Sequence, residues 1–209
     1  MRFAIVVLVA LVACGGSSDK RAQAPKGDPL AGLEADELYR RGLAAAGSGD
    51  YVRAEQYLSA SIDRGYSQDR ALPSLIEVCV AASRLRAAID YAEPYLRRNP
   101  KKWHLRYLVA SLYLGVGEPS RARDELERVA SEQPDKADPH YLLAVVLAEQ
   151  FADYDRARTH YRRYLELAPE SDKADEVRAS LKLLDRAAGT DAARLDAREG
   201  EPRTEEAQQ

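Results

Sequence analysis

Apolar residues along the chain form helical stripes that recur in successive segments. Two neighbouring segments have apolar side chains at i, i+3, i+4 and i+7: Leu72, Leu75, Ile76 and Cys79 in one, and Leu105, Leu108, Val109 and Leu112 in the next. This spacing places four side chains on one face of an α-helix. A second kind of stripe begins with a small residue, as in Ala88, Ala92 and Leu96. The pattern predicts pairs of amphipathic helices and no sheet.

The helix pairs repeat every 34 residues. Two series of equivalent positions show the period: Ala54, Ala88, Ala122 and Ala157, and Pro100, Pro134 and Pro169. In both series the last step is 35 residues instead of 34. One inserted residue near Glu149 to Ala152 explains both steps. A fixed period of this length indicates an array of stacked hairpins.

This pattern resembles the tetratricopeptide repeat, a helix–turn–helix unit. Four units match it: Ala35–Gln68, Asp69–Lys102, Trp103–Lys136 and Ala137–Glu170. The resemblance implies an all-α fold, an α-solenoid of about four hairpins. A fifth helix, from Ser171 to about Ala188, has an apolar stripe of its own and is expected to cap the last hairpin. We therefore predict an array with its capping helix over 35–188, followed by a disordered polar tail over 189–209.

Four residues depart from the family's pattern. Tyr95 and Tyr164 stand where the second helix usually has a small residue, and Arg106 stands where a bulky apolar residue is common. Pro94 falls inside a predicted helix, where it removes a backbone donor. We expect Pro94 to kink or shorten that helix.

The N-terminus predicts export. Arg2 precedes an unbroken apolar run over 3–12, which is shorter than the ~20 residues that span a bilayer. A positive start followed by a short apolar run is typical of a signal peptide. The run ends in Leu-Val-Ala-Cys14, which resembles the bacterial lipobox. The alternative is an ordinary cleaved signal with a chance cysteine.

The lipobox resemblance implies a signal peptide over 1–13 and a lipid on Cys14, the only covalent group or cofactor expected. Residues 14–34 form a Gly-, Ser- and Pro-rich segment that is expected to be a flexible tether. Gly15 stands where inner-membrane lipoproteins of enteric bacteria have Asp, so an outer-membrane site facing the periplasm is expected.

The net charge and the absence of catalytic motifs exclude several classes of function. The formal net charge of -3 provides no basic field for nucleic acid. The basic clusters are solvated faces, or contacts for anionic lipid or an acidic partner: Arg97, Arg98, Lys101, Lys102 and Arg106, and Arg156, Arg158, Arg162 and Arg163. The sequence contains no phosphate loop, no nucleophile elbow and no His-Glu-x-x-His. We predict no enzyme, no catalytic residue and no metal site, and we expect Cys79 to be a buried, inert thiol.

The resemblance also implies a binding groove lined by the first helix of each repeat. Its fifth position, which commonly faces the groove, is Tyr39, Pro73, Tyr107 and Tyr141, and Arg70 and His104 flank it from the second position. Tyrosine suits a binding surface because it offers large contact area and few rotamers to freeze. The alternative, left open by the sequence, is that these tyrosines pack between helices.

The favoured interpretation is a membrane-anchored scaffold or adaptor that binds protein or peptide segments of an envelope complex. It resembles the lipid-anchored repeat proteins of outer-membrane protein assembly and of pilus or secretin biogenesis. The alternative function is binding of cell-wall glycan or a small ligand, since tyrosine rings also stack on sugars.

Overall fold

The computed structural model describes residue 30 and residues 32–199, and describes side chains as far as Arg186. Contacts divide the chain into Met1–Leu33 and Glu34–Gln209, and every helix of the described part lies in the second unit. The predicted signal peptide, Cys14, residues 14–29 and 31 of the tether, and residues 200–209 of the tail lie outside the described residues. No described helix is long and apolar enough to cross a membrane.

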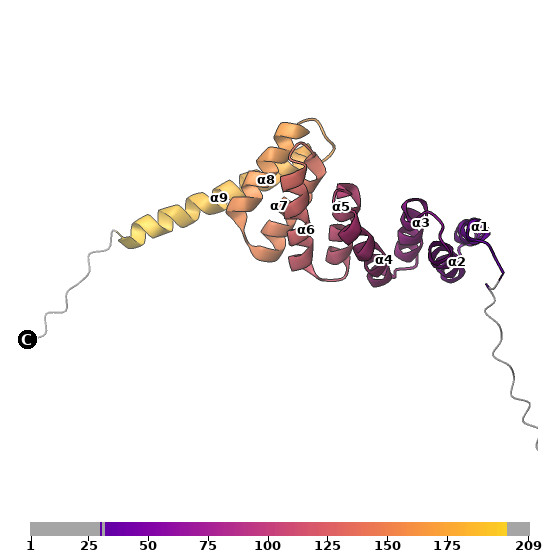
Figure 1. Ribbon diagram of the computed structural model, residues 1–209. Helices are drawn as coiled ribbons and strands as arrows, with labels where there is room; N and C mark the ends of the chain where they lie inside the picture. Colours follow the sequence, from indigo (N-terminus) through magenta and orange to yellow (C-terminus); the bar gives the residue numbers. More distant parts are fainter. Residues whose placement is uncertain (1–29, 31, 200–209) are drawn as a thin grey trace, which may run out of the picture. The chain divides into compact units, whose positions relative to one another are not determined.

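The described residues form nine helices and no strand, as an all-α solenoid requires. Four hairpins follow one another in chain order: α1 (Ala35–Gly47) with α2 (Tyr51–Asp63), α3 (Gln68–Ala81) with α4 (Leu85–Arg98), α5 (Trp103–Gly115) with α6 (Pro119–Glu132), and α7 (Ala137–Phe151) with α8 (Tyr154–Leu167). The last helix is α9 (Ala174–Glu199). Each helix packs on the next one along the chain, so neighbouring hairpins share their apolar surfaces (Figure 1).

Each hairpin turns through one residue with a left-handed backbone. These residues occupy equivalent positions: Gly49, Ser83, Gly117 and Ala152, with φ of 79°, 58°, 75° and 51°. The residue that follows donates its N–H back into the first helix, as in Arg84 to the carbonyl of Cys79 and Asp153 to that of Leu147. The first of these bonds spans five residues and the second spans six. The predicted insertion therefore lies at the C-terminal end of α7.

Small side chains let the helices of a hairpin approach closely. The four alanines of the 34-residue series, Ala54, Ala88, Ala122 and Ala157, are fully buried. Gly42 plays a similar part on α1, because a Cβ placed there would lie 2.7 Å from Cγ of Leu58 and 3.2 Å from its backbone nitrogen. Leu58 is itself fully buried, so its side chain cannot move away without displacing other core residues.

Replacing Gly42 by Ala is expected to lower the free energy of unfolding by about 1–3 kcal/mol, since overpacking outweighs the ~1 kcal/mol by which Ala is favoured over Gly in a helix. Gly115→Ala is the matched control. A Cβ at Gly115 meets only the terminal methyl of the half-buried Leu85, which can rotate away. Urea unfolding followed by circular dichroism measures both. A Gly42→Ala protein as stable as Gly115→Ala would contradict the close approach.

The expected irregularity at Pro94 has a different outcome in the structure. Helix α4 continues through Pro94 to Arg98, so the expected shortening is wrong. The neighbours Ala92, Tyr95 and Leu96 are buried, and their packing offsets the lost backbone hydrogen bond. The hydroxyl of Tyr95 is also satisfied, because it donates to the carboxylate of Asp69.

The capping stripe faces the last hairpin. Val177 is fully buried in a cluster with Ala144, Tyr161 and Tyr164, and Leu181 packs beside it. Helix α9 then runs on to Glu199, past the end expected near residue 188. Residues 190–199 include three Ala and two Arg, which are good helix formers, and one glycine costs only ~1 kcal/mol. The prediction of a disordered tail from 189 is therefore wrong over 189–199.

Candidate functional site

The predicted groove residues differ in their burial and in the contacts that they make. Tyr39 is half-buried on α1, and its ring stacks on that of Tyr66 with centroids 4.3 Å apart. Tyr107 is half-buried against the core between α5 and α7, and burial raises the pKa of its phenol, with a smaller contribution from Asp138. Arg70 is exposed in the first turn of α3. The groove assignment of these residues stays a prediction.

Tyr141 makes several contacts with α9 and the turn before it. Its hydroxyl donates to Glu176 at 2.9 Å, and Nζ of Lys173 lies 4.4 Å from the ring centroid. Burial, followed by the hydrogen bond to Glu176, raises the pKa of Tyr141 to about 12. These contacts place Tyr141 in the docking of the last helix, where its phenol is held neutral.

His104 is one of the residues that line a pocket between the second and third repeats. The start of α3, the end of α4 and the start of α5 enclose a volume of about 370 Å³. Its lining comprises Gln68, Asp69, Leu72, Pro73, Tyr95, Lys101, Lys102, Trp103, His104 and Leu105. We call this the Trp103 pocket. Of the predicted set, it contains Pro73 and His104.

Trp103 and its neighbours give the pocket an aromatic and apolar wall. Trp103 is half-buried, and its ring stacks on the exposed ring of His104 with centroids 3.4 Å apart. Leu72 and Pro73 come from α3, and Leu105 from α5. Such a wall suits the apolar side chain of a ligand, because burying it releases ordered water at ~25 cal/mol per Å².

The polar rim of the pocket is held in place by bonds that join the start of α3 to α4 and to the turn after it. Asp69 accepts the Tyr95 hydroxyl and pairs with Nζ of Lys102 at 3.4 Å. Arg98 donates to Oε1 of Gln68 at 2.8 Å. Lys101 is exposed beside them. The rim therefore presents fixed polar groups, including both signs of charge, around an apolar floor.

Sequence reasoning did not select Trp103 or Leu105 as site residues, and it named Lys101 only as part of a basic cluster. They lie at the inter-repeat turn and in the first turn of α5, whereas the family's pattern directs attention to the fifth position of each repeat. The signal that points to them is that Trp103 is the only tryptophan of the chain and begins a repeat. A large aromatic residue at such a junction has no partner of its kind in the other three repeats.

The first helices also expose apolar side chains. Leu43, Val80 and Leu108 of α1, α3 and α5 are each about two fifths exposed, at 40%, 41% and 38%. Surface apolar residues that stand singly are normal in folded proteins, so these three do not define a second site.

Metal and thiol chemistry find no support in the described residues. No group of three or more His, Cys, Asp or Glu side chains there is placed to hold a metal ion. Cys79 is fully buried, and burial raises the pKa of its thiol to about 11. The thiol is thus protonated at neutral pH and shielded from reagents.

Models of the tetratricopeptide repeat match residues 80–146 and 140–171 of this chain. No curated protein sequence matches it. Among solved structures, a tetratricopeptide repeat protein from Parabacteroides merdae is 22% identical with a TM-score of 0.65, over 73% of this chain and 60% of that one. The chain thus spans about three fifths of that protein's length.

Two further structures are similar. YrrB, described as a tetratricopeptide repeat protein with an unusual peptide-binding site, is 17% identical with a TM-score of 0.59, over 69% of this chain and 74% of its own. MamA from Desulfovibrio magneticus is 20% identical with a TM-score of 0.56, over 66% and 78%. At these identities the likeness establishes the fold. The chain therefore contains tetratricopeptide repeats arranged as an α-solenoid.

Proposed function

We propose that this repeat array is a scaffold for protein–protein interaction that anchors a partner's peptide in the Trp103 pocket. Tetratricopeptide-repeat proteins are generally non-enzymatic scaffolds that bind peptides or proteins, and YrrB has a peptide-binding site. The observation that supports this pocket is its composition. An apolar floor with Trp103 lies inside a rim of fixed polar groups, which is the arrangement of a binding hot spot.

The volume of the pocket and the charges at its rim indicate what kind of ligand it can bind. A volume of about 370 Å³ accommodates one large or two small side chains of a peptide. The rim has the exposed Lys101 together with the Lys102–Asp69 ion pair, so polar main-chain or side-chain groups of the peptide can be paired. We expect an extended segment with an apolar anchor residue.

We further propose that the scaffold is held in the bacterial cell envelope by a lipid on Cys14. The support is the sequence alone: a positive start, a short apolar run and the lipobox-like end at Cys14. Anchoring restricts the search for the partner to the envelope, where protein assembly and pilus or secretin biogenesis are the expected settings.

The test is site-specific photo-crosslinking in the native host, with the crosslinking residue at His104 on the rim. A matched control places it at Asp124, which is exposed on α6. One protein is expected to crosslink through His104 and not through Asp124. Trp103→Ala is expected to reduce that crosslink at least about tenfold, as loss of a buried aromatic anchor does. Unchanged crosslinking in Trp103→Ala, with helix content intact, would overturn the pocket assignment.

A Cys14→Ser protein separates the anchor from the binding. We expect the native protein in the membrane fraction and Cys14→Ser in the soluble fraction, with the purified partner still bound by both. Membrane retention of Cys14→Ser would reject the lipid anchor and leave the peptide pocket standing.

A further inference from the structure

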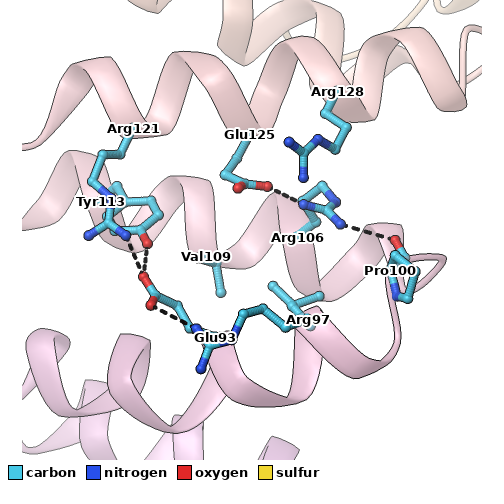
Figure 2. A pocket seen from close by; sticks show the side chains of 10 residues that line it. Glu93, Arg97, Pro100, Arg106, Val109, Tyr113, Arg121, Glu125 and Arg128 are labelled. Carbon is cyan, nitrogen blue, oxygen red and sulfur yellow. Dashed lines mark hydrogen bonds and ion pairs between the residues drawn. The ribbon is translucent and has the colours of Figure 1, made fainter.

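A second pocket lies between α4 and α6, with α5 behind it (Figure 2). Its volume is about 310 Å³, and it shares no lining residue with the Trp103 pocket. Four arginines and two glutamates supply its charge: Arg97, Arg106, Arg121 and Arg128, with Glu93 and Glu125. Leu96 and Val109 add apolar surface. We call it the Arg128 pocket.

Most of these charges already have partners within the protein. Arg121 pairs with Glu93 at 2.7 Å, and Arg97 pairs more loosely with the same carboxylate at 3.6 Å. Arg106 pairs with Glu125. Among the described residues, no hydrogen bond or ion pair engages Arg128, whose side chain extends from α6 towards Arg106 in Figure 2. Arg128 is thus left without an ion-pair partner at the pocket.

Arg106 lies behind Arg128 and is paired with Glu125. Arg106 as a whole is only 4% exposed, and its Nη2 donates to the carbonyl of Pro100 at 3.1 Å. Its Nε is buried without a hydrogen-bond partner. A buried guanidinium is poorly screened by water, so both charges of the Arg106–Glu125 pair act on whatever enters the pocket.

The arginine cluster belongs to this one repeat junction. One repeat earlier, the positions equivalent to Arg97, Arg106, Arg121 and Arg128 are Asp63, Leu72, Ala87 and Pro94. One repeat later they are Ser131, His140, Arg156 and Arg163, and Arg163 is engaged by the carbonyl of Pro134 and by Glu166. The helical architecture therefore does not require arginines here. Their concentration points to a local role.

We propose that the Arg128 pocket binds the carboxylate of an acidic side chain on a partner protein. The guanidinium fork of Arg128 matches a carboxylate with two parallel N–H donors. The lining has four arginines against two glutamates, a formal excess of two positive charges, and Glu93 and Glu125 would repel a doubly charged phosphate more strongly than a carboxylate. Leu96 and Val109 accept the methylene groups of a Glu side chain. That the carboxylate comes from a partner rests on the proposed scaffold function; the pocket is separate from the peptide site.

The test is calorimetric titration of the full chain with an end-blocked peptide of alternating Ala and Glu, at low salt. Arg128→Ala is expected to weaken binding at least about tenfold, the loss typical of a charge-assisted pair. Arg53→Ala is the matched control, because it removes one exposed arginine from α2 outside the pocket. It is expected to bind the peptide as the native protein does. A peptide with Gln in place of Glu is expected not to bind.

Equal affinity of Arg128→Ala and Arg53→Ala for the acidic peptide, or no binding by the native protein, would overturn the proposal. Inorganic phosphate is titrated alongside. If it binds more tightly than the peptide with the same dependence on Arg128, the carboxylate assignment is wrong. Failure here leaves crosslinking through His104 unaffected, so the two sites are tested separately.

Discussion

Replacing Glu125 by Ala is expected to lower the free energy of unfolding by about 2–4 kcal/mol, because it leaves the buried guanidinium of Arg106 without its counter-ion. Only 5% of the Arg106 side chain is exposed, while a quarter of Glu125 reaches solvent, at 25%. The hydrogen bond from Arg106 to Pro100 remains, and Arg128 lies close by without a carboxylate to offset it. Urea unfolding of the variant at neutral pH and moderate salt measures the loss.

The control for this prediction comes from the repeat itself. At the positions equivalent to Arg106 and Glu125, the second repeat has Leu72 and Tyr91. The double variant Arg106→Leu/Glu125→Tyr removes both charges and inserts side chains that the fold already accepts one hairpin earlier. It is expected to unfold within about 1 kcal/mol of the native protein, since an apolar replacement of a buried ion pair is often neutral. A double variant as unstable as Glu125→Ala would show that the charges themselves are not the cause.

The repeat register could be predicted from sequence because it depends on local, periodic features. Ala54, Ala88 and Ala122 mark the close contact within each hairpin, and the shared 35-residue step located the insertion that α7 contains. The ends of the helices could be predicted less well from the sequence. The length of α9 depends on the sum of propensities past Gly189, and the outcome at Pro94 depends on tertiary packing of its neighbours.

The sites were harder to predict because they join residues from different repeats. Arg106 was recognisable as a departure from the pattern, yet its partner Glu125 lies 19 residues away on the next helix. The Trp103 pocket combines Leu72 and Tyr95 of one repeat with Trp103 of the next. Sequence position within a single repeat, from which Tyr107 and Tyr141 were selected, contains no information about how adjacent hairpins fit together.

The last hairpin has a histidine at the position equivalent to Arg106, and we expect this histidine to cause a loss of stability in mild acid. His140 stands where Arg106 stands one repeat earlier, and its Nδ1 lies 2.9 Å from Nδ1 of His160. Burial lowers the pKa of both imidazoles, that of His160 to about 4, with His140 and Arg156 contributing further. At His140 the hydrogen bond to the Pro134 carbonyl opposes the lowering of the pKa and Arg163 adds to it, whereas Glu127 and Asp153 oppose the lowering at His160.

Acidification from pH 7 to pH 5 is therefore expected to remove about 2 kcal/mol of stability through this pair. An unfolded histidine titrates near pH 6.5, so below that pH the unfolded chain binds a proton that the folded chain refuses. The contribution is complete above pH 6.5 and is lost progressively as the pH falls towards 4. Denaturant unfolding at a series of pH values measures the slope.

The variant His140→Leu/His160→Tyr tests the origin of this slope, since Leu72 and Tyr91 occupy the equivalent positions in the second repeat. It keeps His104 and every carboxylate, and its stability is expected to be nearly flat between pH 7 and pH 5. If the variant lost as much stability as the native protein over that interval, the titration would belong to other groups. A flat profile would assign the acid sensitivity of the array to one stacked pair of neutral imidazoles between α7 and α8.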